Sequence, residues 1–236
     1  MRIPQGVSNK ELYTKRLTQF EEEVGVYPVS CEKLAAGRSD CEWLDQVIAG
    51  GARIVQLRDK ESNDRELLAK ARYFRKQTSE AGVLFFLNDR LDIALLTDAD
   101  GMHVGQKDLP AEEIRKLAPD ILIGHSCNTE EQTEILGKAV EQNRSAVSYY
   151  NIGPLFETGT KEGLHHFLGV DGIGTFSRHC SLPFTVMGGI KLQHLDAILA
   201  AGAKRVAVVT AISQAKDMAA ETAIWQQRVR GETNAN

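Results

Sequence analysis

The chain has 236 residues, a formal net charge of −4 at pH 7, 42% hydrophobic residues and 25% charged residues. This composition is typical of a soluble globular protein, and the length suits one α/β domain with a sizeable core. The scattered basic residues exclude nucleic acid as an expected partner. No apolar run reaches the roughly 18 residues of a membrane-spanning helix, so we expect no membrane partner.

The first segment, residues 1–23, is polar and lacks the apolar core and cleavage site of a signal peptide. Tyr13, Leu17, Phe20 and Val24 repeat at helical spacing. We therefore expect a short helical extension that lies on a single main domain of residues 24–236.

The cysteines do not form a recognisable pattern. Cys31, Cys41, Cys127 and Cys180 lie far apart without a C-x-x-C pair, which fits neither a zinc site nor a disulfide framework. We expect reduced thiols and a cytoplasmic location.

Short apolar runs alternate with helical patterns along the main domain. The expected strands are 24–30, 52–58, 83–88, 101–104, 121–124, 146–153, 184–189 and 205–210, and helical patterns include 39–51, 63–82, 129–143 and 192–203. Eight strands alternating with helices predict an α/β protein with a (β/α)8 TIM barrel. An open doubly wound sheet is the alternative, but no G-x-G-x-x-G follows the first strand.

In such a barrel, catalytic groups lie at the carboxyl ends of the strands. Gln56, Arg58 and Lys60 alternate at the end of the second expected strand and therefore share one face. Arg58 offers a planar donor fork and Lys60 a point charge, which together suit a phosphate group. Alternatively, both cations are solvated residues of a loop.

Acidic residues follow the next two strands. Asn88 and Asp89 end the third strand, and Asp108 follows the fourth. Two carboxylates from adjacent strand ends are hard oxygen ligands suited to Mg²⁺. The alternative is that Asp89 and Asp108 are the N-cap residues of the helices that follow, a role that aspartate favours.

The later strands end in hydroxyl groups and glycine. Ser126 follows the fifth strand, whereas Thr129 and Gln132 predict a helix capping box. The loop after the sixth strand contributes Thr158, Thr160 and Lys161 as donors to an anion.

The ends of the seventh and eighth strands carry Gly188, Gly189, Val209 and Thr210, which predict a phosphate site built from backbone N–H groups. Tight packing would also require these glycines. A cation-rich site and a backbone site in one barrel predict two phosphorylated substrates.

The segments "GGARIVQLRDK", "NDRLDIALLTDADGMHVGQKDLP", "GPLFETGTK", "VMGGI" and "AGAKRVAVVTAI" resemble the thiamine-phosphate synthase family across residues 24–215. The resemblance implies a (β/α)8 transferase that joins 4-amino-2-methyl-5-hydroxymethylpyrimidine diphosphate to 4-methyl-5-hydroxyethylthiazole phosphate. Diphosphate leaves first, and the thiazole nitrogen then attacks the resulting cation.

The resemblance also implies a role for each matched residue. Gln56, Arg58, Lys60, Asn88, Ser126 and Lys161 bind the pyrimidine diphosphate, and Thr158, Thr160, Gly189, Val209 and Thr210 bind the thiazole phosphate. Asp89 and Asp108 bind Mg²⁺, and Arg58, Lys60, Lys161 and Ser126 are the expected catalytic groups because they stabilise the leaving diphosphate.

Three positions depart from the family pattern. Asn128 replaces a histidine, Thr210 replaces a serine, and the first strand ends "SCE" where T-D is usual. Alternative interpretations are a thiazole tautomerase-like paralogue, a non-catalytic thiamine-phosphate binder, and an aldolase with a Schiff base on Lys60 or Lys161. The sequence leaves a homo-oligomer open.

Overall fold

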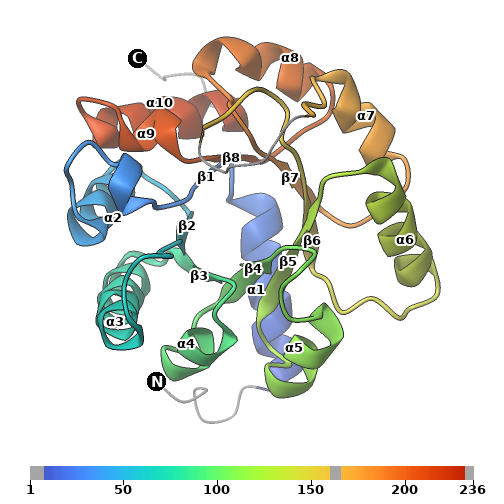
Figure 1. Ribbon diagram of the computed structural model, residues 1–236, viewed down its shortest axis with the longest axis horizontal. Coiled ribbons are helices and arrows are strands. Elements are labelled where there is room, and N and C mark those ends of the chain that lie inside the picture. The colour runs from blue at the N-terminus through green and yellow to red at the C-terminus, as the bar shows by residue number, and fades with distance from the viewer. Residues whose placement is uncertain (1–7, 160–165, 232–236) are drawn as a thin grey trace.

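Eight parallel strands form the centre of the computed structural model, which describes residues 8–159 and 166–231, and helices surround them (Figure 1). The strands are β1 (Val26–Pro28), β2 (Ile54–Leu57), β3 (Leu84–Asn88), β4 (Gly101–Val104), β5 (Leu122–Cys127), β6 (Tyr149–Ile152), β7 (Phe184–Val186) and β8 (Val206–Val208). Each overlaps an expected strand. The structure extends the fifth strand to Cys127, so Ser126 belongs to the strand itself.

The sheet closes on itself. Its order is β1-β8-β7-β6-β5-β4-β3-β2, and a parallel bridge between Val29 and Gln56 joins its two ends. The Ser30 N–H donates to the Gln56 carbonyl at 2.9 Å. The predicted barrel is therefore confirmed, and the open-sheet alternative is wrong.

Helices surround the barrel, and the longer ones begin at clear capping signals. The helices are α1 (Asn9–Glu22), η1 (Glu32–Leu34), α2 (Asp40–Ala49), α3 (Asp64–Ala81), α4 (Leu91–Leu96), α5 (Ala111–Leu117), α6 (Glu130–Glu141), α7 (Asp171–Ser177), η2 (Leu192–His194), α8 (Leu195–Ala200), α9 (Thr210–Ser213) and α10 (Met218–Arg230). Capping boxes start α2, α3 and α6, and the last is the predicted Thr129–Gln132 pair. Among the described residues, none of the helices has the length and apolar character needed to cross a bilayer.

Alternate residues of the strands face two separate apolar cores. Phe85 packs outward with Trp43 and Phe74 of the surrounding helices, whereas its neighbour Phe86 points into the barrel beside Tyr27. The cysteines are free thiols, as expected, and Cys31, Cys127 and Cys180 are buried.

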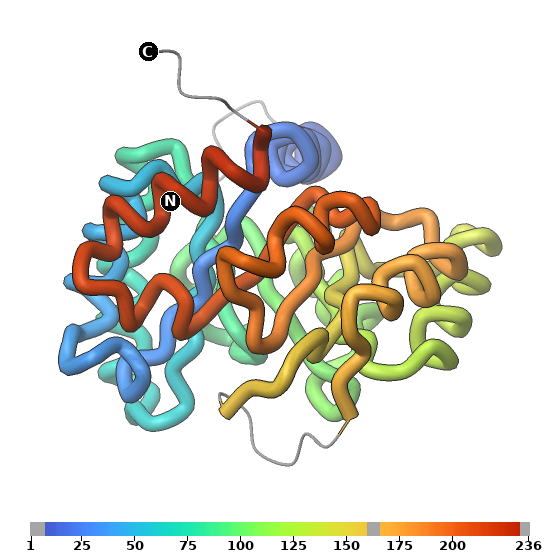
Figure 2. Tube along the Cα trace, turned by 90° about the horizontal axis from the view of Figure 1, so that it is seen from above, coloured from blue at the N-terminus to red at the C-terminus, as the bar shows by residue number. Residues whose placement is uncertain are grey.

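The helix α1 covers the end of the barrel at which the strands begin (Figures 1 and 2). Phe20 is fully buried, and its ring centroid lies 4.6 Å from that of Tyr149 inside the barrel. Arg205, just before β8, donates to the carbonyls of Phe20 and Glu21 at 2.9 Å. The helix α1 thus closes the base of the barrel.

A buried ion-pair network fixes α1 in this position. Arg16 is only 7% exposed, and its guanidinium donates to the carboxylates of Asp100 at 3.0 Å and Asp120 at 2.6 Å. Asp100 also accepts from Arg75 and from the backbone N–H of Phe85. Asp100 and Asp120 stand one and two residues before β4 and β5, so they connect α1 to the sheet.

Candidate active site

The carboxyl ends of the strands surround a pocket at the opposite end from α1. It is lined by all of the predicted site residues that the structure describes, namely Gln56, Arg58, Lys60, Asn88, Asp89, Asp108, Ser126, Thr158, Gly189, Val209 and Thr210. The remaining two, Thr160 and Lys161, lie outside the described residues. Side chains separated by more than a hundred residues therefore share one cavity.

The wall formed by β2 carries the cations. Arg58 is held through its backbone N–H, which donates to Ser30 Oγ at 3.2 Å. Lys60 is half exposed, and its Nζ lies 3.2 Å from Asp89 Oδ2. Gln56, Arg58 and Lys60 all line the pocket, as their alternation predicts.

Asp89 is held in an unusual conformation beside this wall. Its φ is 62°, in the left-handed region that few non-glycine residues adopt and that is often found at functional sites. Asn88 Nδ2 donates to Asp89 Oδ2 at 2.6 Å. Burial raises the pKa of Asp89; the charge of Lys60 opposes this rise, and that of Asp108 adds to it.

The helix-capping alternatives for the two aspartates are wrong. The helices α4 and α5 begin at Leu91 and Ala111, and the residues in their N-cap positions are Arg90 and Pro110. Asp108 Oδ2 instead accepts from the backbone N–H of Gly105 at 2.7 Å.

Both carboxylates therefore face the pocket, close enough that the charge of Asp108 adds to the rise in the pKa of Asp89. Among the described residues, no three acidic, histidine or cysteine side chains form a complete metal cage. Two hard oxygen donors instead fit a Mg²⁺ ion whose coordination is completed by substrate phosphate and water.

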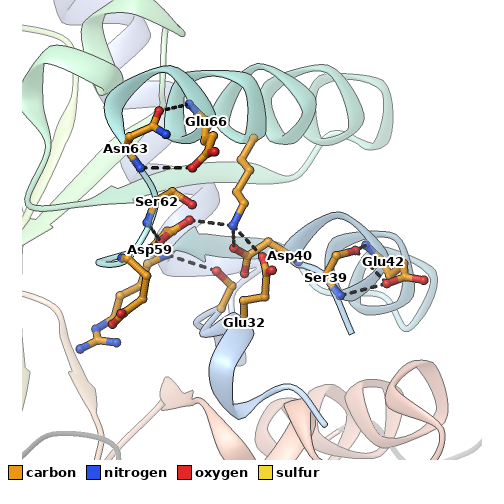
Figure 3. Close-up of polar contacts among 12 residues, drawn as sticks. Glu32, Ser39, Asp40, Glu42, Asp59, Ser62, Asn63 and Glu66 are labelled. Carbon is orange, nitrogen blue, oxygen red and sulfur yellow. Dashed lines mark hydrogen bonds and ion pairs between the residues drawn. The ribbon is translucent and has the colours of Figure 1, made fainter. Parts of the chain in front are cut away.

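A lysine-centred ion cluster supports the cation wall from behind (Figure 3). Lys70 Nζ lies 2.6 Å from a carboxylate oxygen of Glu32, 3.0 Å from one of Asp40 and 2.7 Å from one of Asp59. We call these four residues the Lys70 cluster. Asp59 stands between Arg58 and Lys60 in sequence, so the cluster fixes the backbone that carries both cations. No pattern in the sequence indicates this cluster.

Asp59 also organises its own loop. Its Oδ1 accepts from the backbone N–H groups of Glu61 and Ser62, both at 2.9 Å. Burial raises the pKa of Asp59, but the hydrogen bonds from Lys70 and Ser62 outweigh this and hold it well below its usual range. Burial has the larger effect on Asp40, whose pKa is raised.

Several residues of the pocket floor were also missed. Tyr27, His103, Asn151 and Thr185 line it. His103 Nε2 lies 2.9 Å from Ser126 Oγ, and Thr185 Oγ1 donates to Asn151 Oδ1 at 2.8 Å. The period of two in "GMHV" could have identified His103, because outward-facing Met102 places its neighbour inside the barrel.

The wall formed by β7 and β8 depends on glycine. Gly188 and Gly189 have φ values of 107° and 61°. A methyl group on Gly188 would lie 2.5 Å from Pro154 Cβ, and one on Gly189 would overlap the Glu157 carbonyl. Both glycines are thus required for tight packing against the loop after β6, as the alternative interpretation of these residues predicted. The same two residues also line the pocket.

Asn128, which replaces the histidine of many family members, connects two strand ends. Its Nδ2 donates to the Gly153 carbonyl at 2.6 Å, and its backbone N–H donates to Gln132 Oε1 at 2.7 Å. Its side chain thus has a structural role between β5 and β6 in addition to lining the pocket.

A (β/α)8 barrel with charged side chains gathered at the carboxyl ends of its strands is the architecture of an enzyme that acts on small molecules. The family model described as thiamine monophosphate synthase matches residues 26–212. The chain belongs to the thiamine monophosphate synthase family and is a transferase.

Individual relatives agree with this assignment. The thiamine-phosphate synthase of Shouchella clausii is 37% identical over 196 residues, which cover 83% of this chain and 91% of the relative. That of Methanospirillum hungatei is 38% identical, with 84% of this chain and 94% of the relative covered. The solved thiamine phosphate pyrophosphorylase from Pyrococcus furiosus superposes with a TM-score of 0.79 at 26% identity, covering 90% of this chain and 98% of the other.

Proposed function

We propose that the enzyme joins 4-amino-2-methyl-5-hydroxymethylpyrimidine diphosphate to 4-methyl-5-hydroxyethylthiazole phosphate, forming thiamine phosphate and releasing diphosphate. The observation that carries the proposal is the pocket's two-sided lining. Cations and carboxylates come from the β2, β3 and β4 ends, whereas glycine backbone and threonine hydroxyls come from the loops after β6, β7 and β8. Each side suits one phosphorylated substrate.

The diphosphate lies on the charged side in this proposal. Asp89 and Asp108 would hold Mg²⁺, which would neutralise charge on the diphosphate when bound. Arg58 and Lys60 bind the diphosphate oxygens from the opposite side, and Gln56 and Asn88 orient the pyrimidine end. The Lys60 Nζ lies 3.2 Å from Asp89 Oδ2. In this proposal, Lys60 exchanges that contact for one with the diphosphate.

The reaction needs charge stabilisation more than a side-chain nucleophile. The bond between the pyrimidine methylene carbon and the diphosphate oxygen breaks, and its electron pair leaves with diphosphate. Arg58, Lys60 and Ser126 stabilise that charge as it develops, together with Lys161, which stands outside the described residues. The thiazole nitrogen then donates its lone pair to the methylene cation and forms the new C–N bond.

The thiazole phosphate lies on the glycine side in this proposal. Backbone N–H groups at Gly189, Val209 and Thr210 and the hydroxyl of Thr158 are the phosphate donors, with Thr160 added from outside the described residues. This arrangement places the thiazole ring across the pocket from the leaving diphosphate, so the attacking nitrogen and the leaving oxygen lie on opposite sides of the methylene carbon.

The other interpretations have less support. A tautomerase-like paralogue or a passive binder has no use for the complete set of cations and acids on the β2 to β4 side. A Schiff-base lysine requires desolvation, whereas the Lys60 side chain is 54% exposed and lies beside a carboxylate. A cytoplasmic location and a homo-oligomer stay predictions.

The test is to mix the purified protein with both substrates, with and without Mg²⁺, and to measure thiamine phosphate as fluorescent thiochrome. We expect product only in the presence of Mg²⁺. Binding of the thiazole phosphate without product would contradict the proposal and favour the tautomerase-like or binder interpretation.

A further inference from the structure

A chain of hydrogen bonds crosses the inside of the barrel beneath the pocket. Gln56 Nε2 donates to the Tyr27 hydroxyl at 2.8 Å, and that hydroxyl lies 3.3 Å from the Tyr149 hydroxyl. The Tyr149 hydroxyl lies 3.0 Å from His103 Nδ1, and His103 Nε2 lies 2.9 Å from Ser126 Oγ. We call these five residues the relay. It joins two predicted substrate contacts, Gln56 and Ser126.

Three of the five relay residues are buried, whereas His103 and Ser126 are partly exposed toward the pocket. Gln56 is 4% exposed, Tyr27 1% and Tyr149 0%. Phe20 of α1 packs on the Tyr149 ring from below, and Phe86 contacts it edge-on. Because bulk water has little access, each buried hydroxyl must find its partners within the relay.

The bond directions follow from one fixed donor. An amide nitrogen can only donate, so the Tyr27 oxygen accepts from Gln56 and the Tyr27 proton is left for Tyr149. The Tyr149 hydroxyl then donates its hydrogen bond to His103 Nδ1, which must accept and therefore carries no proton. The imidazole proton therefore lies on Nε2 and is donated to Ser126 Oγ.

The relay is less stable if the hydrogen bond between Tyr27 and Tyr149 runs in the opposite direction, with Tyr149 as the donor. That direction would leave the Tyr27 proton without an acceptor among the described residues, at a position that is 1% exposed. A buried donor without a partner costs about 1 to 3 kcal/mol. The relay therefore selects a single tautomer of His103.

Gly124 in β5 makes the central bond of the relay possible. A methyl group at this position would overlap the Tyr149 ring and hydroxyl and would lie 2.5 Å from His103 Nδ1. The absence of a side chain at Gly124 leaves the space in which the Tyr149 hydroxyl meets the imidazole. The close approach of these two side chains thus explains why a glycine stands in the middle of this strand.

We propose that the relay fixes the Ser126 hydroxyl as a donor to the diphosphate, with Tyr27, Tyr149 and His103 as positioning residues. Ser126 Oγ accepts a hydrogen bond from His103 Nε2–H. The Ser126 hydroxyl proton is therefore directed into the pocket that Ser126 lines. The assignment of diphosphate as the acceptor of the Ser126 hydroxyl rests on the proposed function. Gln56 becomes more than a pyrimidine contact, because it sets the direction of the whole relay.

The tautomer can be measured without substrate. In ¹⁵N-histidine-labelled wild-type protein, we expect long-range ¹H–¹⁵N correlation spectra to show His103 with a protonated Nε2 and an unprotonated Nδ1. A His103→Gln sample identifies the resonance by its loss. A proton on Nδ1, alone or together with one on Nε2, would overturn the relay.

Two neighbouring tyrosines of β6 give a matched pair of variants. Tyr149→Phe removes one hydroxyl from the relay, whereas Tyr150→Phe removes one that donates to the Cys180 carbonyl on the outer side of the sheet. We expect Tyr149→Phe to change the His103 ¹⁵N shifts and to weaken inhibition by inorganic diphosphate about tenfold, the value of one hydrogen bond to a charged group. Binding of the thiazole phosphate should stay unchanged.

Tyr150→Phe should change neither the shifts nor the inhibition constant, and equal effects of the two variants would overturn the proposal. If Tyr149→Phe does not fold, Tyr27→Phe breaks the relay one link earlier with the same expected results. Failure of the proposed function would show separately, as absence of thiamine phosphate from wild-type reactions. That outcome would overturn the assigned use of the Ser126 proton.

Discussion

The two ends of the barrel use the same types of charged residue in different ways. At the base, Arg16 is 7% exposed and its guanidinium donates to two carboxylates. At the mouth, Lys60 and Asp89 form a looser contact of 3.2 Å, with the lysine side chain 54% exposed.

The difference shows which charges are available for chemistry. At the base, the pairing of Arg16 is complete and holds α1 in place, so a ligand would have to break it. At the mouth, Asp89 is partly desolvated and near Asp108, which favours the arrival of a cation. Substitutions at the mouth should therefore change activity, and substitutions at the base should change stability.

The largest expected effect is at the mouth. Asp89→Asn keeps the shape and tolerates the left-handed backbone. It removes the charge proposed to bind Mg²⁺, so we expect kcat/KM to fall by about 10² to 10³. Stability at pH 7 should stay equal or rise slightly, because the raised pKa of Asp89 means that folding disfavours its ionised form.

Thiochrome kinetics and urea denaturation check this prediction. Asp196→Asn is the control, since the Asp196 side chain is 88% exposed in a surface pair with Arg228. A parallel loss of stability and activity in Asp89→Asn would show instead that the residue is structural.

The next largest effect is at the base. Arg16→Met leaves Asp100 and Asp120 without their shared partner, so we expect a loss of about 3 kcal/mol in the free energy of unfolding. The kcat/KM of the folded enzyme at 25 °C should not change. Lys138→Met breaks an exposed helix pair with Glu134 and should cost under about 0.5 kcal/mol. Equal losses in the two variants would remove the contrast between the barrel's two ends.

The Lys70 cluster lies between these extremes, because it is partly buried yet supports the mouth. Lys70→Met should raise the KM for the pyrimidine diphosphate about tenfold, since Asp59 would no longer hold the loop of Arg58 and Lys60. Lys70→Arg should restore most of the affinity. Steady-state kinetics with each substrate varied in turn distinguish this from general damage, which would alter both KM values.

The smallest effect is a pH dependence of stability. The pKa of Asp59 is lower in the folded protein than in the unfolded chain, so this group stabilises the fold above the unfolded value of about 3.9. The contribution is lost as the pH falls below that value. Melting temperatures of wild type and Asp59→Asn should therefore keep a nearly constant difference from pH 7 to about pH 4 and converge as the pH falls further toward the lowered pKa of the folded state. A difference that does not shrink below about pH 4 would contradict the assignment.

The sequence predicted the barrel because its strands are buried on both faces and read as uninterrupted apolar runs. It predicted the mouth residues because polar side chains such as Arg58 and Asp89 stand where those runs end. All the predicted site residues in the described part of the chain line one pocket, although their substrate roles stay predictions.

The missed residues carried no distinctive local signal. Tyr27 and Tyr149 look like ordinary core aromatics, and their hydroxyls acquire a role only when strands 122 residues apart in sequence meet. Lys70 looks like a surface residue of an amphipathic helix, yet it contacts three carboxylates, which come from the starts of η1 and α2 and from the loop after β2. Such networks depend on tertiary geometry, which periodicity does not encode.

The helix α1 also constrains the order in which the molecule can assemble. Its partners Asp100, Asp120, Ser148 and the arginine before β8 stand 84, 104, 135 and 185 residues further along the chain. Contacts over such separations form late, because the entropy of closing the intervening loops must be offset first. The helix α1 is therefore synthesised before all of these partners, yet it is among the last segments to reach its native position.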